Sequence, residues 1–401
     1  MADRLIYLDN AATSWPKPAC VGTAMSAFLE NHAGNPGRGG HSLARAAAAP
    51  AEEVRARLAE QLNAASVDRV VLTHGCTDSV NIAIHGVIRA AIACPDTPKP
   101  HVVTSSIEHN AVLRTLQCYV ESNSIELSIA ACDETGWTDP DDVLAVLRPE
   151  TVLVCVSHAS NATGTIQPIR DIGTAVRSMT RRGLLLVDSA QTIGHVGLDA
   201  QHDFADLISI AGHKGLLGPT GTGALIVGER AWPDDPAARS FVCERRGGTG
   251  AVGRGMEMPD TLPDALEAGT INAVGFAGLL AAMREPLPGR HEHEALLTRR
   301  LLEGLGSIPA VKLMGLPGVE GRTAVVLFTI DGWHPREAAT YLDEHEQICV
   351  RGGTHCAPLL HERMGTAASG ALRASPGWST SAEEIDAFVK AIESMCVRTA
   401  V

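Results

Sequence analysis

Aromatic side chains make up only 3% of this 401-residue chain, and no apolar run approaches the length of a membrane span. The first residues contain no apolar segment of the signal-peptide type. Lysine and arginine total 33 against 46 acidic residues, a net charge of −13, and no basic stretch stands out. We therefore expect a cytoplasmic protein with no membrane span and no nucleic-acid partner.

The ten cysteines lack CxxC pairs and lack the spacing of zinc ligands. Scattered cysteines of this kind are typical of buried thiols in a reducing cytoplasm. One run, residues 291–294, is rich in metal-ligand types and reads His-Glu-His-Glu, which we interpret as a solvated helix start. We expect no metal site there.

Glycine is frequent, with 39 residues, and hydrophobic residues make up 45% of the chain, which indicates a loop-rich α/β protein with an aliphatic core. A helix is expected at residues 44–63, interrupted near Pro50. From residue 70 onward, apolar runs alternate with helical stretches, and this alternation predicts a mostly parallel sheet with crossover helices. The runs are residues 70–73, 101–104, 152–156, 184–187, 207–210 and 224–227.

The chain is long enough for two domains, and residues 286–289, Pro-Leu-Pro-Gly, form the best boundary between them. Beyond this boundary we expect a smaller α+β domain, with helices at 291–306, 335–345 and 382–396 and strands at 323–330 and 347–351. We assign residues 17–285 to a large domain. Residues 1–16 and 286–401 are assigned to the small domain.

Polar residues follow five of the six runs, and parallel strands bring their carboxyl ends to one edge of the sheet, where ligands bind. Asp188 ends the fourth run, and Lys214 follows the fifth. This pair is what pyridoxal phosphate (PLP) requires, because a lysine holds its aldehyde as a Schiff base and an acid keeps its ring nitrogen protonated. The alternative for the pair is a structural ion pair at the sheet edge.

Residues 75–78, Gly-Cys-Thr-Asp, lead from the first run into an apolar helix. A glycine turn and a hydroxyl at a helix N-terminus are typical of a phosphate cradle, because free backbone N–H groups and the helix dipole favour an anion. The alternative is a simple N-cap by Thr77.

Two features of the predicted small domain also indicate chemistry. Cys356 stands beside His355 in a glycine-hinged loop, and a partly exposed thiol next to an imidazole is set up to become a thiolate. Arg373 is suited to hold a substrate carboxylate in bidentate fashion. The alternatives are a structural cysteine for Cys356 and a surface ion pair for Arg373.

Together these motifs resemble the class V aminotransferase family of fold-type I PLP enzymes, and within it the cysteine desulfurases and selenocysteine lyases. The resemblance spans nearly the whole chain. It implies a large domain with a mostly parallel seven-stranded sheet plus a small α+β domain carrying the catalytic cysteine loop. The matching segments are residues 7–13, 108–109, 160–164, 188–191, 212–214 and 267–270 and the Cys356 loop.

The resemblance also implies a role for each candidate residue. Lys214 would bind the PLP aldehyde and later move the substrate proton. The other cofactor contacts would be Asp188 at the ring nitrogen, His109 on the ring face, Gln191 at the phenolic oxygen, and Thr77, the Cys76 amide, His213 and the partner subunit's Thr270 at the phosphate. Asn161, Arg351 and Arg373 would position the substrate carboxylate.

In this picture Cys356 would take sulfur from L-cysteine as a persulfide and leave L-alanine, in a homodimer that passes the sulfur to a small acceptor protein. The 17-residue interval from Cys356 to Arg373 resembles the short-loop branch of the family. Ala211 stands where relatives carry Ser or Thr, so one phosphate hydroxyl is missing. Thr354 and Pro358 depart from the commonest short-loop pattern, so the sulfur donor and the acceptor stay open. The alternatives are a selenocysteine lyase, another PLP lyase or epimerase of this family, and a non-catalytic scaffold, against which the presence of both Lys214 and Asp188 argues.

Overall fold

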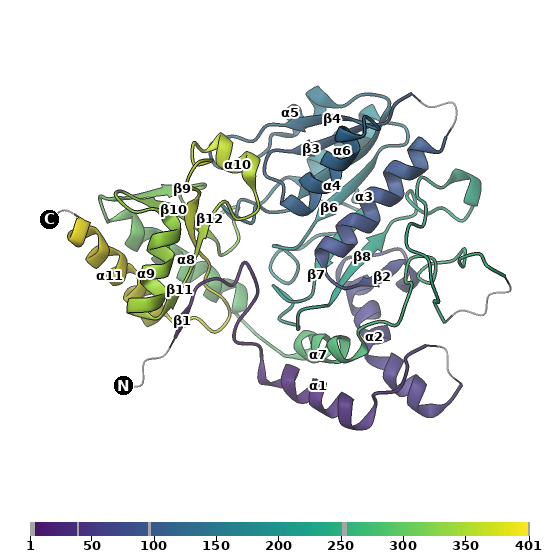
Figure 1. The fold of residues 1–401 in the computed structure, drawn as a ribbon, viewed down its shortest axis with the longest axis horizontal. Helices are drawn as coiled ribbons and strands as arrows, with labels where there is room; N and C mark the ends of the chain where they lie inside the picture. The colour runs from purple at the N-terminus through teal and green to yellow at the C-terminus, as the bar shows by residue number, and fades with distance from the viewer. Residues whose placement is uncertain (1–4, 38–39, 95–97, 251–254, 400–401) are drawn as a thin grey trace.

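The computed structural model describes residues 5–37, 40–94, 98–250 and 255–399. Figure 1 shows two groups of elements: a large sheet with its helices on one side of the view, and a smaller sheet with the last helices and both chain ends on the other. Within the described ranges, no helix combines the length and the apolarity needed to cross a bilayer.

The large sheet has seven strands in the order β2-β8-β7-β6-β5-β3-β4. Its strands are β2 (Val70–Thr73), β3 (His101–Ser105), β4 (Glu126–Ala130), β5 (Thr151–Ser157), β6 (Leu184–Asp188), β7 (Leu207–Ala211) and β8 (Gly223–Val227). Pairing is parallel from β7 through β6, β5 and β3 to β4, whereas β8 is antiparallel to both β7 and β2. This confirms the α/β fold with a mostly parallel seven-stranded sheet.

Each of the six apolar runs forms a strand of this sheet. The seventh strand, β4, lies at the edge and keeps several residues partly or fully exposed, so its sequence does not form an apolar run. Because β8 alone is reversed, β2, β3, β5, β6 and β7 all point the same way. Their carboxyl ends therefore share one edge, as expected.

Helices cover both faces of the large sheet. Along β6, Leu185 and Val187 pack into one helical layer and Leu184 and Leu186 into the other, because side chains alternate along a strand. The first layer contains α2 (Ser42–Gln61), α5 (Pro140–Val146), α6 (Ile169–Met179) and α7 (Ala273–Arg284), and the second contains α3 (Cys76–Ile92) and α4 (Asn110–Glu121). Helix α1 (Ala19–Asn31) packs on α7, and short 3-10 turns occur at Val67–Arg69 and Pro236–Ala238.

The expected interruption of helix α2 near Pro50 is wrong, because the helix continues through this residue from Ser42 to Gln61. Proline removes one backbone donor inside a helix, which ordinarily bends or ends it. Here Ala47 and Ala51 are completely buried on either side of Pro50. Tertiary packing therefore holds the helical path despite the lost hydrogen bond.

The smaller sheet has four antiparallel strands in the order β12-β13-β10-β9. They are β12 (Arg351–Gly353), β13 (Ala371–Ala374), β10 (Val326–Ile330) and β9 (Val311–Met314). Strand β1 (Ile6–Tyr7) pairs in parallel with β11 (Ile348–Cys349), so the start of the described chain lies against this region. The helices beside it are α8 (Arg290–Gly306), α9 (Pro335–Glu346), α10 (Pro358–Arg363) and α11 (Ala382–Thr399).

The three helices expected beyond residue 290 are present, with ends within three residues of the expected ones. The strand expected at 323–330 begins only at Val326. The strand expected at 347–351 is two short strands, because Ile348–Cys349 pairs with β1 whereas Arg351–Gly353 pairs with β13.

Candidate active site

A cavity of about 590 Å³ opens at the carboxyl edge of the large sheet. Its walls come from the segments that follow β2, β3, β5, β6 and β7, as the strand directions require. The structure brings together eight of the residues expected here, namely Cys76, Thr77, His109, Asn161, Asp188, Gln191, His213 and Lys214. Four other expected residues, Thr270, Arg351, Cys356 and Arg373, are not part of its walls.

Asp188 and Lys214 stand on neighbouring strand ends, since Asp188 pairs with Ser209 across β6 and β7 and Lys214 follows β7. Burial lowers the pKa of the Lys214 amine, while the nearby Asp188 carboxylate opposes this effect. No ion pair within 4.0 Å joins the two in the described part of the chain. The sheet-edge ion pair considered as an alternative is therefore not formed, and both groups are left facing the cavity.

The helix α3 begins at the cavity with Gly75 as its N-cap residue. Gly75 has a φ of +153°, and a Cβ on Gly223 would lie only 2.6 Å from the Gly75 Cα, so the turn and strand β8 approach very closely. No side chain caps this helix, so the simple N-cap by Thr77 is not formed. Amides of a first helical turn have no intrahelical acceptor, and here the residues of that turn line the cavity.

His213 closes the same end of the cavity. Its ring Nδ1 lies 3.0 Å from Thr13 Oγ1, and its carbonyl accepts a hydrogen bond from Lys17 Nζ at 2.7 Å. Burial, with Lys214 and Lys17 nearby, lowers the pKa of His213 to about 4, so the imidazole is neutral. The residues around 13–17 therefore lock the segment that carries Lys214.

His109 caps helix α4, because its Nδ1 accepts the Ala111 N–H at 3.0 Å. This bond leaves the ring proton on Nε2, and burial lowers the pKa of the imidazole. The Gln191 amide donates to the Ala11 carbonyl at 2.9 Å, and the same side chain also lines the cavity. These two hydrogen bonds therefore hold the His109 ring and the Gln191 side-chain amide each in one orientation.

The Cys356 loop is tied to the cavity wall through its backbone. The Asn110 N–H donates to the Cys356 carbonyl at 2.7 Å, and Asn161 Nδ2 donates to the His355 carbonyl at 2.5 Å. His355 and Cys356 both have left-handed backbone angles, with φ of +52° and +57°. The Cys356 side chain is exposed. The thiol therefore lies at the rim of the cavity, on a loop that is docked over it.

His355, the imidazole expected beside this thiol, does not supply a positive charge. His355 is only 6% exposed, and burial, with Arg373 close by, lowers its pKa to about 3. Its Nδ1 lies 3.2 Å from His361 Nε2, and its Nε2 lies 3.3 Å from the Arg351 carbonyl. The imidazole is neutral and serves to brace the loop, because its nitrogens are used for these internal bonds.

Arg373 is 2% exposed, so it is not the surface ion pair considered as an alternative. Its Nη2 bonds Asp9 Oδ1 at 2.6 Å, its Nη1 donates to the Asn161 carbonyl at 2.9 Å, and its Nε has no partner among the described residues. Arg351 bonds the other carboxylate oxygen of Asp9 at 2.9 Å. Asp9 thus holds both arginines beside Asn161, with one buried donor still unpaired.

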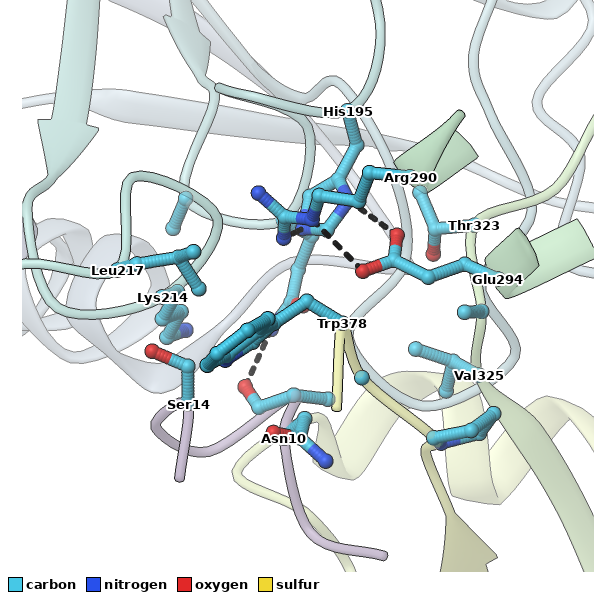
Figure 2. A pocket seen from close by; sticks show the side chains of 16 residues that line it. Asn10, Ser14, His195, Lys214, Leu217, Arg290, Glu294, Thr323, Val325 and Trp378 are labelled. Carbon is cyan, nitrogen blue, oxygen red and sulfur yellow. Dashed lines mark hydrogen bonds and ion pairs between the residues drawn. The ribbon is translucent and has the colours of Figure 1, made fainter. Parts of the chain in front are cut away.

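A second, much smaller cavity of about 30 Å³ lies behind Lys214 (Figure 2). On its far wall His195, Arg290 and Glu294 point toward one another. Glu294 Oε2 lies 2.8 Å from His195 Nδ1 and its Oε1 lies 2.9 Å from Arg290 Nε, while Arg290 Nη1 donates to the Gly215 carbonyl at 2.7 Å. The cluster therefore fixes the residue that directly follows Lys214.

The interpretation of residues 291–294 as a solvated helix start is wrong for Glu294, which is 3% exposed. Burial raises the pKa of this carboxyl, but His195 and Arg290 outweigh burial and lower the pKa to about 2. Thr270, by contrast, is exposed and stands apart from the main cavity of its own chain.

Sequence reasoning missed several residues that shape the site. Asp9 was visible only as part of the 7–13 segment, and nothing in the sequence places it against Arg373. Glu108 is fully buried and accepts hydrogen bonds from Ser105 Oγ and from the amide and hydroxyl of Ser157. Burial raises the pKa of Glu108 to about 7 despite these bonds. Asp9 and Arg373, like Glu108 and Ser157, come from segments far apart in the chain.

A mostly parallel sheet whose carboxyl edge holds a half-buried lysine, a buried acid and a helix N-terminus around one cavity defines an α/β protein with a candidate ligand site at that edge. The family model for class-V aminotransferases matches residues 6–388. This chain belongs to the class-V aminotransferase family.

Relatives and solved structures agree with this assignment. A probable cysteine desulfurase of Methanothermobacter thermautotrophicus is 32% identical, and the match covers 97% of this chain and 94% of the relative. A cysteine desulfurase of Haloferax volcanii is 30% identical over 97% of this chain and 89% of its own length. The structure of an apo cysteine desulfurase from Thermococcus onnurineus superimposes with a TM-score of 0.88 at 29% identity, covering 98% of this chain and 95% of that one.

Proposed function

We propose that this protein is a cysteine desulfurase that uses pyridoxal 5'-phosphate to convert L-cysteine to L-alanine and carries the sulfur as a persulfide on Cys356. One observation carries the proposal. A cavity with a half-buried lysine and a buried carboxylate lies under a docked loop whose only exposed thiol is that of Cys356. The names of the full-length relatives support the same activity.

The residues present fit this cofactor. The free amides of the first turn of α3, with Thr77 and His213, suit its phosphate, and Asp188 suits its protonated ring nitrogen. His109 would lie on the ring face, Gln191 would bond the phenolic oxygen, and Lys214 would hold the aldehyde. When bound, the cofactor supplies an electron sink for the substrate α-carbon.

The chain itself would do the rest of the chemistry. Asn161, Arg351 and Arg373 would hold the substrate carboxylate, and the unpaired Arg373 Nε is a buried donor suited to that contact. Lys214, whose pKa is lowered by burial, would take the α-proton and return it. The Cys356 thiolate would attack the substrate sulfur, so that an S–S bond forms as the carbon–sulfur bond breaks, and protonation of that carbon yields alanine.

We further propose a homodimer in which the partner subunit's Thr270 completes the phosphate site, since Thr270 is exposed and stands away from its own cavity. The exposed Cys356 thiol would pass sulfur to a small acceptor protein. We divide the chain into residues 17–285 and residues 1–16 with 286–401, because β1 pairs with β11 of the smaller region. A cytoplasmic location agrees with ten cysteines that are scattered along the chain.

The test is to load the purified protein with PLP, add L-cysteine, and measure alanine, sulfide and the mass of a Cys356 persulfide. Stoichiometric persulfide with alanine release supports the proposal. Alanine from L-selenocysteine without any from L-cysteine would make the protein a selenocysteine lyase instead. PLP binding with neither product would point to another lyase or epimerase of the family, and no PLP binding at all would point to a scaffold.

A further inference from the structure

The Cys76 thiol lies at the floor of the cavity and contacts Asp188, which also lines the cavity. Cys76 is the first residue of helix α3, and its Sγ lies 3.2 Å from Asp188 Oδ1 and 3.3 Å from Ser209 Oγ. Burial, together with the Asp188 charge, raises the pKa of this thiol well above its ordinary value. The sulfur therefore keeps its proton and is a hydrogen-bond donor.

The two oxygens of the Asp188 carboxylate differ sharply in their surroundings. Oδ1 accepts the Ala190 N–H at 2.9 Å in addition to the Cys76 S–H. Oδ2 has no hydrogen-bond partner among the described residues, although Asp188 is only 7% exposed. Oδ2 is not among the fully buried unpaired atoms, because Asp188 lines the cavity, so a group in the cavity can donate to this oxygen. The pattern leaves one oxygen held by the chain and the other open to the cavity.

The Ser209 hydroxyl is the second polar group within hydrogen-bond distance of the Cys76 thiol. The Ser209 hydroxyl has its own acceptor, the Val187 carbonyl, at 3.4 Å. The Ser209 oxygen can still accept a proton, but Asp188 Oδ1 lies slightly closer to Cys76 Sγ, at 3.2 Å against 3.3 Å, and is charged, which makes it the stronger acceptor of the single S–H proton.

We propose that Cys76 is a positioning residue for Asp188: its S–H and the Ala190 N–H together fix Oδ1, so that Oδ2 is presented to the protonated ring nitrogen of the cofactor. This inference rests on the proposed function, because it needs PLP in the cavity. It goes beyond that function by giving the Cys76 side chain, rather than its amide alone, a role in the site. Cys76 touches Asp188 and acts on the cofactor only through it.

The experiment measures PLP binding to the full-length protein, with no sulfur substrate present. Cys76→Ala removes the donor, and loss of one hydrogen bond is expected to weaken PLP binding about fivefold. Cys76→Ser keeps a donor on a side chain of similar size and should bind PLP within about twofold of the parent. In an Asp188→Asn background, Cys76→Ala should add almost nothing, because the two residues act as one unit.

Cys155→Ala is the matched control. Cys155 is a fully buried thiol on β5 that stands near Asp188 electrostatically, but it has no hydrogen bond to Asp188 among those of the described residues. This variant should leave PLP affinity unchanged. Thermal unfolding of each apo variant separates a folding defect from a binding defect.

The outcomes are distinct. Equal weakening in Cys76→Ala and Cys76→Ser would show a packing role and overturn the inference, as would parent-like binding in both variants. An additive effect of Cys76→Ala in the Asp188→Asn background would overturn it too. If the parent itself binds no PLP, the proposed function fails first, and this result is separate from any difference among the variants.

Discussion

The floor and the rim of the cavity each present a cysteine, and the two thiols differ in almost every physical respect. Cys76 starts a helix at the end of a buried strand and bonds a carboxylate at 3.2 Å. Cys356 is exposed, on a loop whose backbone is left-handed at two successive residues. Burial and a nearby negative charge suit the first thiol to donate a hydrogen bond, whereas exposure and a loop suit the second to react and move.

This contrast shows that residue type alone does not assign a role in this protein. The floor is built from strand ends, whose direction is set by the sheet, so its groups are held in fixed positions. The rim is a loop whose backbone carbonyls accept hydrogen bonds from the Asn110 N–H and from the Asn161 side-chain amide. Changes in the floor should therefore affect every function of the site, while changes in the rim should affect only the sulfur step.

Lys214→Ala tests the floor and should have the largest effect. Loss of both the anchor and the proton carrier is expected to lower turnover of L-cysteine and of L-selenocysteine alike by at least ~10⁴-fold. The measurement is alanine formation, with the visible absorption of the PLP-loaded protein as a second readout. Lys312→Ala, at an exposed lysine on β9, is the control and should behave like the parent. Normal turnover in Lys214→Ala would remove this residue from the mechanism.

Cys356→Ala tests the rim. Alanine formation from L-cysteine should fall by at least ~10³-fold, because the nucleophile is gone, while PLP affinity should stay that of the parent. Selenocysteine should be spared in large part, since a selenolate leaves without help. Cys118→Ala, at another exposed thiol, is the control. If cysteine turnover and persulfide mass survive in Cys356→Ala, the thiol is structural and a different PLP lyase reaction takes over.

The floor was largely predictable from the sequence, and the reason is the sheet. The strand runs are apolar and well spaced, and the carboxyl ends of parallel strands meet at one edge, so the sequence alone predicts that Asp188, His109 and Lys214 lie together. The edge strand β4 was not predicted, because its partly exposed residues do not form an apolar run. The predicted helix interruption at Pro50 was wrong, because the buried packing of Ala47 and Ala51 outweighs the low helix propensity of proline.

The rim was less predictable, because its state depends on burial and on partners remote in sequence. His355 stands next to Cys356, but burial lowers the pKa of its imidazole to about 3, and the sequence carries no sign of that burial. Asp9 meets Arg373 across an interval of 364 residues. Glu294 was expected in solvent, but His195 covers it from a different element. None of these contacts leaves a periodic signal in the sequence.

Asp9→Asn tests how much the ion pairs of Asp9 with Arg351 and Arg373 stabilise the protein. Asp9 balances the buried guanidinium of Arg373 and also bonds Arg351, so removing its charge leaves a buried cation without a counter-charge. We expect a loss of about 3 kcal/mol in the free energy of unfolding, measured with denaturant. The control is Asp386→Asn, which breaks an exposed pair with Arg300 and should change stability little. Equal effects of the two substitutions would contradict the buried-pair argument.

The smallest expected effect is a pH dependence carried by the two imidazoles under the Cys356 loop. Burial lowers the pKa of His355 to about 3 and that of His361 to about 4, against about 6.5 in an unfolded chain. Because the unfolded state takes up protons below pH 6.5 and the folded rings do not, their contribution to stability is complete above pH 6.5 and is lost as the pH falls. Each ring should cost about 1.4 kcal/mol at pH 5.5.

The measurement is the free energy of unfolding at pH 8 and at pH 5.5 for the parent and for His361→Gln. The hydrogen bonds suggest why both rings stay neutral: Thr366 Oγ1 lies 2.8 Å from His361 Nδ1, and His361 Nε2 lies 3.2 Å from His355 Nδ1. A proton on either acceptor nitrogen breaks this chain. His361→Gln should therefore lose less stability than the parent over that interval, by about 1.4 kcal/mol. An equal loss of unfolding free energy in both proteins would mean that the neutral His361 ring does not stabilise the Cys356 loop. The loop would then be held by the hydrogen bonds to its backbone alone.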